Sequence, residues 1–244
     1  MKRIITEERN RKVKNELKTP RAAAVAGILF SLLMLSVLFI TDGFAEVNTE
    51  NLATEWVDKW SRLASLAITM ISFAGIAFLW FTGVMRDRLG DQEDRFFATI
   101  FLSSGIILVI LFFMWGAILS AIVNTEILIT TQVATHLYIF VFTLMDEILG
   151  NYALRAASIY MFAICTLWTK TGVMPRWLTI LTYILAFGFL VTAQSIREAK
   201  YIFPAWVFVV SVYILVLDYK NTRNEKELKT KLNKETKNRQ EGAS

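Results

Sequence analysis

The residues best suited to chemistry gather in one apolar stretch near the middle of the chain: they are His136, Asp146, Glu147, Asn151 and Arg155. An ionisable side chain inside a membrane span is costly to bury, so such a residue marks a candidate functional site. Arg155 fits best, because apolar or small residues surround it in NYALRAASIYMFAICTLW. Its guanidinium is suited to binding an anionic group or to lining a water-filled path, with Glu147 as its partner.

The spacing of these residues predicts a polar stripe along one helix. Counting from the single histidine, the polar positions are His136, Thr143, Glu147, Asn151, Arg155 and Ser158. Their offsets of seven, four, four, four and three place them on one helix face. A break at Gly150 would separate the two halves. Two structural roles remain as alternatives: Arg155 pairs with Glu147 or Asp146, or it reaches out to the membrane interface. His136 is better suited to an interfacial hydrogen bond than to ligand binding.

Several classes of site are missing from the sequence. A b-type haem in a membrane normally needs paired histidines, and a retinal Schiff base needs a lysine within a span. The chain has one histidine, and no predicted span contains a lysine. The patterns HExxH, GxSxG and GxxxxGK[ST] are absent, and the single cysteine, Cys165, permits no internal disulfide. We therefore expect no enzymatic activity, no cofactor and no metal.

The composition points to a membrane protein. Of the 244 residues, 55% are hydrophobic, which exceeds the roughly 45 to 50% of ordinary soluble domains. The apolar residues form runs of about 20, the length that crosses a hydrocarbon layer of about 30 Å. We therefore predict an all-α fold, a polytopic transmembrane helical bundle of one domain.

Six spans account for these runs: residues 22–41, 63–85, 96–123, about 148–169, 177–193 and 201–217. A cleavable signal peptide is the rival interpretation of the first, but its apolar run is longer than a signal sequence needs. The stretch 127–168 is the difficult one, because 42 residues of helix extend about 63 Å. It holds either two spans, which makes seven in all, or one span and a partly buried outer or re-entrant helix over 127–147.

The distribution of Lys and Arg favours six spans. With six, 21 of the 26 basic residues lie on one side of the membrane and 4 on the other, and basic residues favour the cytoplasmic side. Seven spans would move the cluster after Leu217 outside. We predict a multi-pass protein of the cell inner (plasma) membrane. It has a basic cytoplasmic segment at 1–21, a transmembrane domain at 22–218 and a charged cytoplasmic tail at 219–244. The tail extends the last helix and frays into disorder.

Two segments next to the spans have simple structural interpretations. The charged stretch RDRLGDQEDR, residues 86–95, is a cytoplasmic turn in which Gly90 and Asp91 cap the flanking helices. The stretch 48–63 places Leu52, Trp56 and Trp60 on one face and predicts an interfacial helix. A cytoplasmic docking role for the first segment is the less favoured alternative.

Two longer stretches resemble a known family. They are RDRLGDQEDRFFATIFLSSG and NYALRAASIYMFAICTLWTKTGVMPRWLTILTY, and the turn TGVMPRWL is similar to one in the DUF4386-type family. The resemblance runs from the second span to the last one. It implies an uncharacterised bacterial multi-span membrane protein, and it implies no biochemical activity.

Three functional hypotheses are consistent with these features. The first is a non-enzymatic, membrane-embedded interaction or sensory protein. The second is a small-solute or ion transporter or channel that uses the polar stripe around Arg155 and Glu147. The third, an intramembrane enzyme acting on lipid, lacks a recognisable nucleophile or metal set. As partners we expect membrane lipids, with anionic headgroups near the basic termini, and a homo-oligomer or a membrane partner of unknown identity. We expect no nucleic acid, because aromatic residues do not interleave the basic ends.

Overall fold

The computed structural model describes residues 19–45, 52–89, 95–124, 132–172, 174–192 and 198–241. Side chains are described for 21–43, 62–86, 95–123, 139–170, 172, 174–191, 198–220 and 222–223. Every regular element in these ranges is helical. This confirms the predicted all-α bundle.

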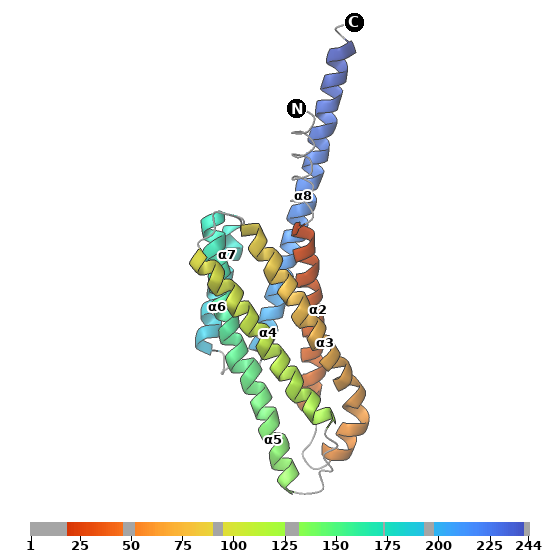
Figure 1. Ribbon diagram of the computed structural model, residues 1–244, viewed down its shortest axis with the longest axis vertical. Coiled ribbons are helices and arrows are strands. Elements are labelled where there is room, and N and C mark those ends of the chain that lie inside the picture. The colour runs from red at the N-terminus through yellow and green to blue at the C-terminus, as the bar shows by residue number, and fades with distance from the viewer. Residues whose placement is uncertain are drawn as a thin grey trace.

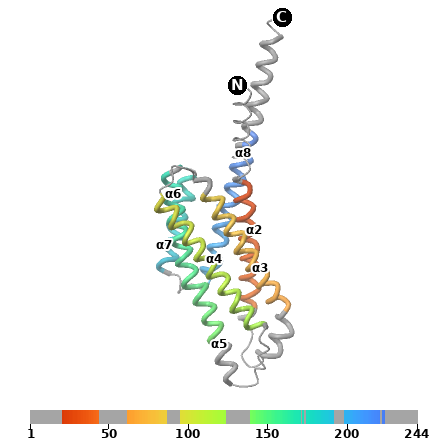
Figure 2. Tube along the Cα trace, viewed as in Figure 1, coloured from red at the N-terminus to blue at the C-terminus, as the bar shows by residue number. Residues whose placement is uncertain are grey.

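The helices follow the apolar runs of the sequence. Their bounds are α2 Thr19–Ala45, α3 Leu52–Leu89, α4 Arg95–Asn124, α5 Gln132–Glu147, α6 Leu154–Thr171, α7 Arg176–Thr192 and α8 Ala199–Glu241. A short π-helix, η2 Ile148–Ala153, joins α5 to α6. Successive helices run in opposite directions, so α2 begins and α8 leaves the bundle at the same end (Figures 1 and 2).

The first and last helices lie side by side and close the bundle. Helix α2 packs against both α3 and α8, while α4 lies between α3 and α6. Helix α7 packs mainly on α6 and forms a hairpin with it. Helix α7 is therefore the peripheral helix of the bundle.

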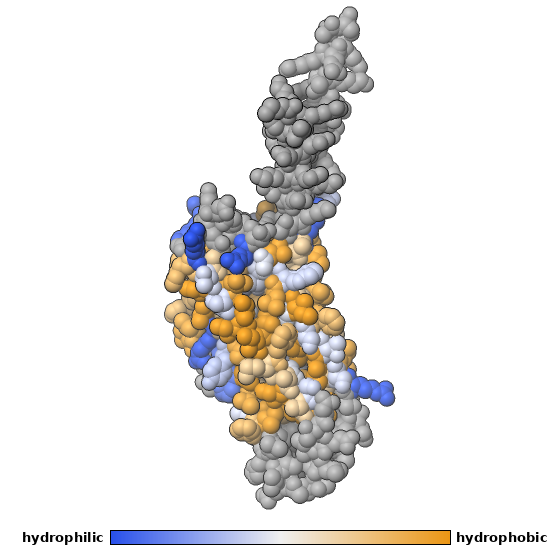
Figure 3. All heavy atoms as spheres, in the orientation of Figure 1, coloured by the Kyte–Doolittle hydropathy of each residue, from blue (hydrophilic) through white to orange (hydrophobic). Residues whose placement is uncertain are grey.

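Among the residues that the structure describes, five helices are long and apolar enough to cross a membrane, with α5, η2 and α6 counted as one. The sixth, α7, has 17 residues and extends about 25 Å, slightly less than the hydrocarbon thickness of about 30 Å. Apolar side chains cover much of the outer surface between the two ends (Figure 3). Phe39, Trp80 and Ile184, for example, are all more than 60% exposed. Such a surface is stable in lipid, and the chain is a multi-pass membrane protein.

The difficult central stretch forms one continuous rod. Helix α5 passes into η2 and then α6 without interruption, so Gly150 does not break the helix. The described part of residues 127–147, from Gln132 onward, is thus a direct extension of the fourth span. The expected re-entrant or separate outer helix is not found there. The chain accommodates Gly150 and Asn151, which are poor helix formers, by widening one turn.

The turn between α6 and α7 lies in the stretch TGVMPRWL, residues 171–178. Gly172 has a φ of 65°, the left-handed conformation that glycine adopts easily, and its N–H donates to the Trp168 carbonyl at 2.9 Å. Pro175 precedes the first residue of α7, and its carbonyl accepts from the Leu178 N–H at 3.1 Å. Gly90 and Asp91, predicted to cap the other turn at this end, lie outside the described residues.

Two terminal expectations have mixed outcomes. Residues 52–63 belong to α3 as a continuous helix, but the side chains of Trp56 and Trp60 lie outside the described part. Helix α8 is helical to Glu241, so helix covers most of the tail that was expected to fray. The helix that crosses the bundle therefore continues past the last apolar residues.

Aromatic rings fill the centre of the bundle. The centroid distance is 4.8 Å for Phe30 and Phe78, and 4.5 Å for Phe101 and Tyr160. Phe203 lies 5.8 Å from Phe78. These rings come from five helices, α2, α3, α4, α6 and α8, and each such pair contributes about 0.5 to 1.5 kcal/mol beyond its area burial. The core is thus a single aromatic cluster shared by most of the bundle.

Candidate functional site

Two of the predicted polar residues, Glu147 and Asn151, lie at or next to the π-helix η2. Asn151 lies within η2, and its Nδ2 donates to Glu147 Oε2 at 3.0 Å. The Asn151 Oδ1 atom is buried and has no hydrogen-bond partner in the structure. A π turn inside an α-helix is frequent at functional sites because it redirects side chains. Glu147 is therefore paired with Asn151, its neighbour on the predicted stripe, and one acceptor of Asn151 remains unsatisfied.

Arg155 lies one turn later and is half-buried. It makes no hydrogen bond or ion pair with any residue that the structure describes, so it pairs with neither Glu147 nor Asp146. Tyr152, which is 60% exposed, and Ile159, which is 47% exposed, flank it on the same helix. Arg155 therefore lies at the lipid-facing edge of α6 rather than in the bundle centre.

The polar stripe does not continue along one face. Thr143, on one side of η2, is exposed and donates to the Ile139 carbonyl of its own helix at 2.8 Å. Ser158, on the other side, is fully buried and donates to the Ala186 carbonyl of α7 at 2.7 Å. The widened π turn accounts for the change of direction, since the predicted offsets assumed a regular α-helix. Asp146 is exposed, and His136 lies in α5 outside the described side chains.

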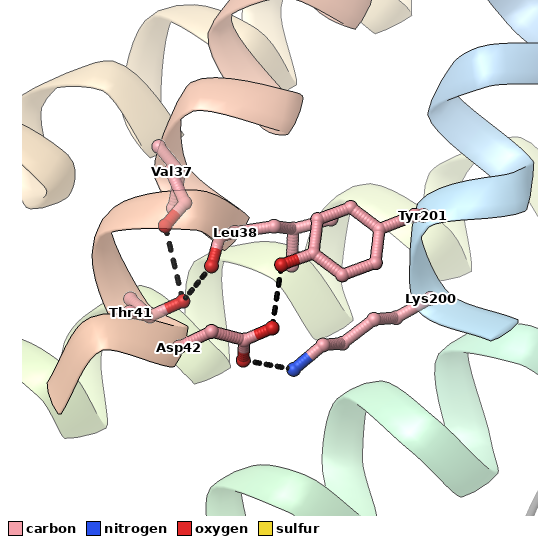
Figure 4. Close-up of polar contacts among 6 residues, drawn as sticks. All are labelled: Val37, Leu38, Thr41, Asp42, Lys200 and Tyr201. Atoms are coloured by element: carbon pink, nitrogen blue, oxygen red, sulfur yellow. Dashed lines mark hydrogen bonds and ion pairs between the residues drawn. The ribbon is translucent and has the colours of Figure 1, made fainter. Parts of the chain in front are cut away.

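A second polar cluster, which sequence reasoning missed, joins α2 to α8. The Asp42 carboxylate accepts from Lys200 Nζ and from Tyr201 Oη (Figure 4). The Lys200 side chain is only 10% exposed and that of Asp42 is 33% exposed. Both residues lie just outside the predicted spans, where a charge needs no partner. The sequence does show that Asp42 and Lys200 each stand at the edge of an apolar run. It gives no indication that these two residues contact each other.

A small cavity lies behind this cluster. Its volume is about 10 Å³, which is room for about one water molecule. Lys200 and Pro204 of α8, Leu149 and Ala153 of η2, and Met34 of α2 are among its lining residues. Because proline has no N–H, Pro204 leaves the Lys200 carbonyl without its usual helical donor. Apart from Lys200, the lining is apolar.

The opposite end of α2 and α8 carries a matching ion pair. Arg21 Nε donates to Asp218 Oδ2 at 2.6 Å, and its Nη2 donates to Thr222 Oγ1 at 3.2 Å. Asp218 is only 4% exposed, and a surface cleft of about 730 Å³ opens beside the pair. Between the two ion pairs, and nearer to that of Arg21, Gly27 faces Ser211 closely enough that a Cβ there would meet Ser211 Oγ at 2.0 Å. Helices α2 and α8 are thus joined by an ion pair at each end and approach each other closely between them.

Two further pairs of buried polar groups bond between helices. Thr82 Oγ1 lies 3.1 Å from Tyr160 Oη, and Trp206 Nε1 donates to Thr182 Oγ1 at 2.8 Å. Over the part of the chain that the structure describes, no three His, Cys, Asp or Glu side chains come close enough to hold a metal ion. These hydrogen bonds stabilise helix packing and leave no free reactive group among the residues named.

Comparisons with protein-family models, with curated proteins and with solved structures found no match for this chain. The resemblance to the DUF4386-type family therefore stays a prediction.

Proposed function

We propose that this chain is a non-enzymatic membrane protein that acts through contacts with other membrane components, in an interaction or sensory role. The observation that supports the proposal is the packing of the interior. Aromatic side chains occupy the centre, and the cavity among α2, α4, η2, α6 and α8 has a volume of only about 10 Å³. A solute path would need a larger, polar interior.

The alternative, a transporter or channel for small solutes or ions, has less support from the geometry. Glu147, Asn151 and Arg155 do not line the cavity. The ion pairs of Asp42 with Lys200 and of Arg21 with Asp218 hold α2 and α8 together at both ends, whereas alternating access requires helices to move against each other.

The same proposal extends to placement and partners. Helix α2 begins and α8 leaves the bundle at one end (Figure 1). Together with the six predicted spans, this supports placing both termini on the same side of the membrane. The basic residues near the termini favour the cytoplasmic side of a bacterial inner membrane. Anionic lipid headgroups are suitable partners for the basic ends. A homo-oligomer or another membrane protein would complete the interaction role, and membership of the DUF4386-type family fits it.

Cysteine accessibility tests the proposal directly. In a Cys165→Ser background, Ala157→Cys places a thiol at the cavity wall, where Ala157 is 1% exposed. Arg176→Cys, at an exposed position at the start of α7, is the matched control. We expect a charged, water-soluble thiol reagent added to open membranes to label the control and to label position 157 only after unfolding. Comparable labelling of both in the native state would reveal a water path and favour the transporter.

A further inference from the structure

The apolar belt on the α6–α7 side of the bundle is short. On α6 it is bounded by the charges of Arg155 and Lys170, at positions 15 residues apart, which is about 23 Å of helix. On α7 it runs from Arg176 to the last described side chain, Val191, again 15 residues and about 23 Å. The two helices thus agree on an apolar length about 7 Å below the usual hydrocarbon thickness of about 30 Å.

The belt on the α3–α4 side is much longer. The span of α3, Arg62–Arg86, has 25 residues, and that of α4, Arg95–Val123, has 29. They extend about 36 Å and about 42 Å without a charge inside them. The span of α8, Ala199–Lys220, has 22 residues and extends about 32 Å, which is close to the usual thickness. The apolar surface therefore varies in length by about 13 Å or more around the bundle.

The extra length lies at the end of the bundle opposite the α6–α7 turn. Near that turn, the Lys170 Nζ atom lies 5.0 Å from the Phe97 ring centroid, so α4 and α6 have their ends at one level. Further along, Phe112 of α4 and Ala153 of the rod line the same cavity and are level as well. The charge of Arg155 stands two residues from Ala153, whereas the span of α4 continues for 11 more residues, about 17 Å, beyond Phe112. The two belts therefore begin together and end at different depths.

Helix tilt does not remove this difference. Helices α4 and α6 pack side by side in opposite directions (Figure 1), so both have nearly the same inclination to the bilayer. Tilt reduces the depth that a helix covers, so it would make the short side thinner still. On the long side, apolar side chains remain exposed past the level of Arg155: Phe73 of α3 is 59% exposed and Met114 of α4 is 48% exposed. These side chains need hydrocarbon at a level where the α6–α7 side already carries a charge.

We propose that the bundle holds the bilayer at two thicknesses, thin beside α6 and α7 and thick beside α3 and α4. A bilayer thins next to a hydrophobic face that is too short and thickens next to one that is too long. The Arg155 guanidinium then lies among the headgroups of the thinned side, with its stem along apolar surface. The lipids that fit the α6–α7 side are phospholipids with short acyl chains, and no single lipid has to be held. The proposal is independent of the interaction role, and it gives the protein a preference for boundaries between thin and thick membrane.

Depth measurements at two positions on one level test the step. In a Cys165→Ser background, Tyr152→Cys on the rod and Met114→Cys on α4 each carry a nitroxide spin label; the native side chains are 60% and 48% exposed. The full chain is reconstituted in dioleoyl phosphatidylcholine, and electron paramagnetic resonance measures collisions with oxygen and with a water-soluble nickel chelate. We expect the ratio of nickel to oxygen collisions to be severalfold higher at position 152 than at 114, because only the first lies at headgroup level. In Arg155→Leu the ratio at 152 should fall towards that at 114, whereas Arg62→Leu, an exposed arginine at the far end of the α3 span, should leave it unchanged.

Lipid composition gives a second readout that needs no change at Arg155. Ile184→Cys on α7 and Ile76→Cys on α3, which are 62% and 51% exposed in the native chain, carry a fluorescent label in mixtures of short-chain and long-chain phosphatidylcholine. Bromination of the short-chain lipid should quench the label at 184 more strongly than the label at 76, and bromination of the long-chain lipid should reverse the order. Equal collision ratios at 152 and 114, low access of both collision partners at 152, as inside a protein interface, or equal quenching at 184 and 76 would each overturn the proposal.

Discussion

Replacing Gly27 with alanine tests how closely the first and last helices approach. A Cβ at this position would lie 2.0 Å from Ser211 Oγ on α8 and 2.8 Å from Phe81 Cδ2 on α3. The serine hydroxyl can rotate away, but the buried Phe81 ring, 0% exposed, has little room to move. Forcing an extra methyl group into a packed core typically costs about 1 to 3 kcal/mol.

The helix propensity of alanine works in the opposite direction and must be removed from the comparison. Alanine favours a helix over glycine by about 1 kcal/mol. Gly83→Ala in α3 supplies the control, because nothing lies within 4 Å of a Cβ there. We expect Gly27→Ala to be less stable than Gly83→Ala by about 1 to 3 kcal/mol, since the difference isolates the overpacking.

Reversible unfolding in mixed detergent micelles, followed by helical circular dichroism, measures this difference. Ser211→Ala alone should change little, because Ser211 Oγ is buried without a hydrogen-bond partner. Combined with Gly27→Ala it should restore part of the lost stability, with a coupling of about 0.5 kcal/mol or more. If Gly27→Ala were as stable as Gly83→Ala, the close approach of α2 and α8 would be refuted.

Three further predictions concern polar contacts and the α6–α7 turn. Lys200→Met keeps the apolar stem at the cavity but removes the ion pair with Asp42. We expect the free energy of unfolding to fall by about 1 to 3 kcal/mol, less than for a fully buried pair because Asp42 is 33% exposed. In a double-mutant cycle, adding Asp42→Asn to Lys200→Met should recover part of this loss. Tyr160→Phe leaves Thr82 Oγ1 without its partner, so the free energy of unfolding should fall by about 0.6 to 1.7 kcal/mol, as for other interhelical hydrogen bonds in membranes. An unchanged free energy of unfolding would show that this contact does not stabilise the fold. Gly172→Ala places a Cβ at a φ of 65° and should lower the free energy of unfolding by about 1 to 2 kcal/mol. Gly172→Asn should lower it by less. Equal Tm values for the two variants would contradict the role of the left-handed cap.

The helices themselves were predictable because the signal for them is local. The apolar run at 22–41 reappears as the span Arg21–Gly43, and the run at 63–85 as Arg62–Arg86. A hydrocarbon layer requires every backbone polar group to bond within its own segment, so length and hydropathy suffice to predict a helix. The left-handed residue of the α6–α7 turn is a glycine, Gly172, as the preference of that conformation for glycine leads one to expect.

The polar stripe could be predicted only in part. Its spacing assumed 3.6 residues per turn, and the pairing of Asn151 with Glu147 obeys that spacing within one segment. The π turn at η2 then rotates the start of α6 relative to α5, so Ser158 faces α7 while Thr143 is exposed. A single widened turn leaves no periodic signal in the sequence, which is why Arg155 was expected on a shared polar face.

The sequence alone determined where the apolar helices lie along the chain and the all-α class, since each depends only on residues near one another in the chain. The tertiary structure decided which helices touch. The cluster of Asp42 with Lys200 joins positions 158 residues apart, and the contact of Gly27 with Ser211 joins α2 to α8. Such pairs arise from how the helices pack side by side, and packing depends on the shapes of facing side chains, which no single run of sequence encodes.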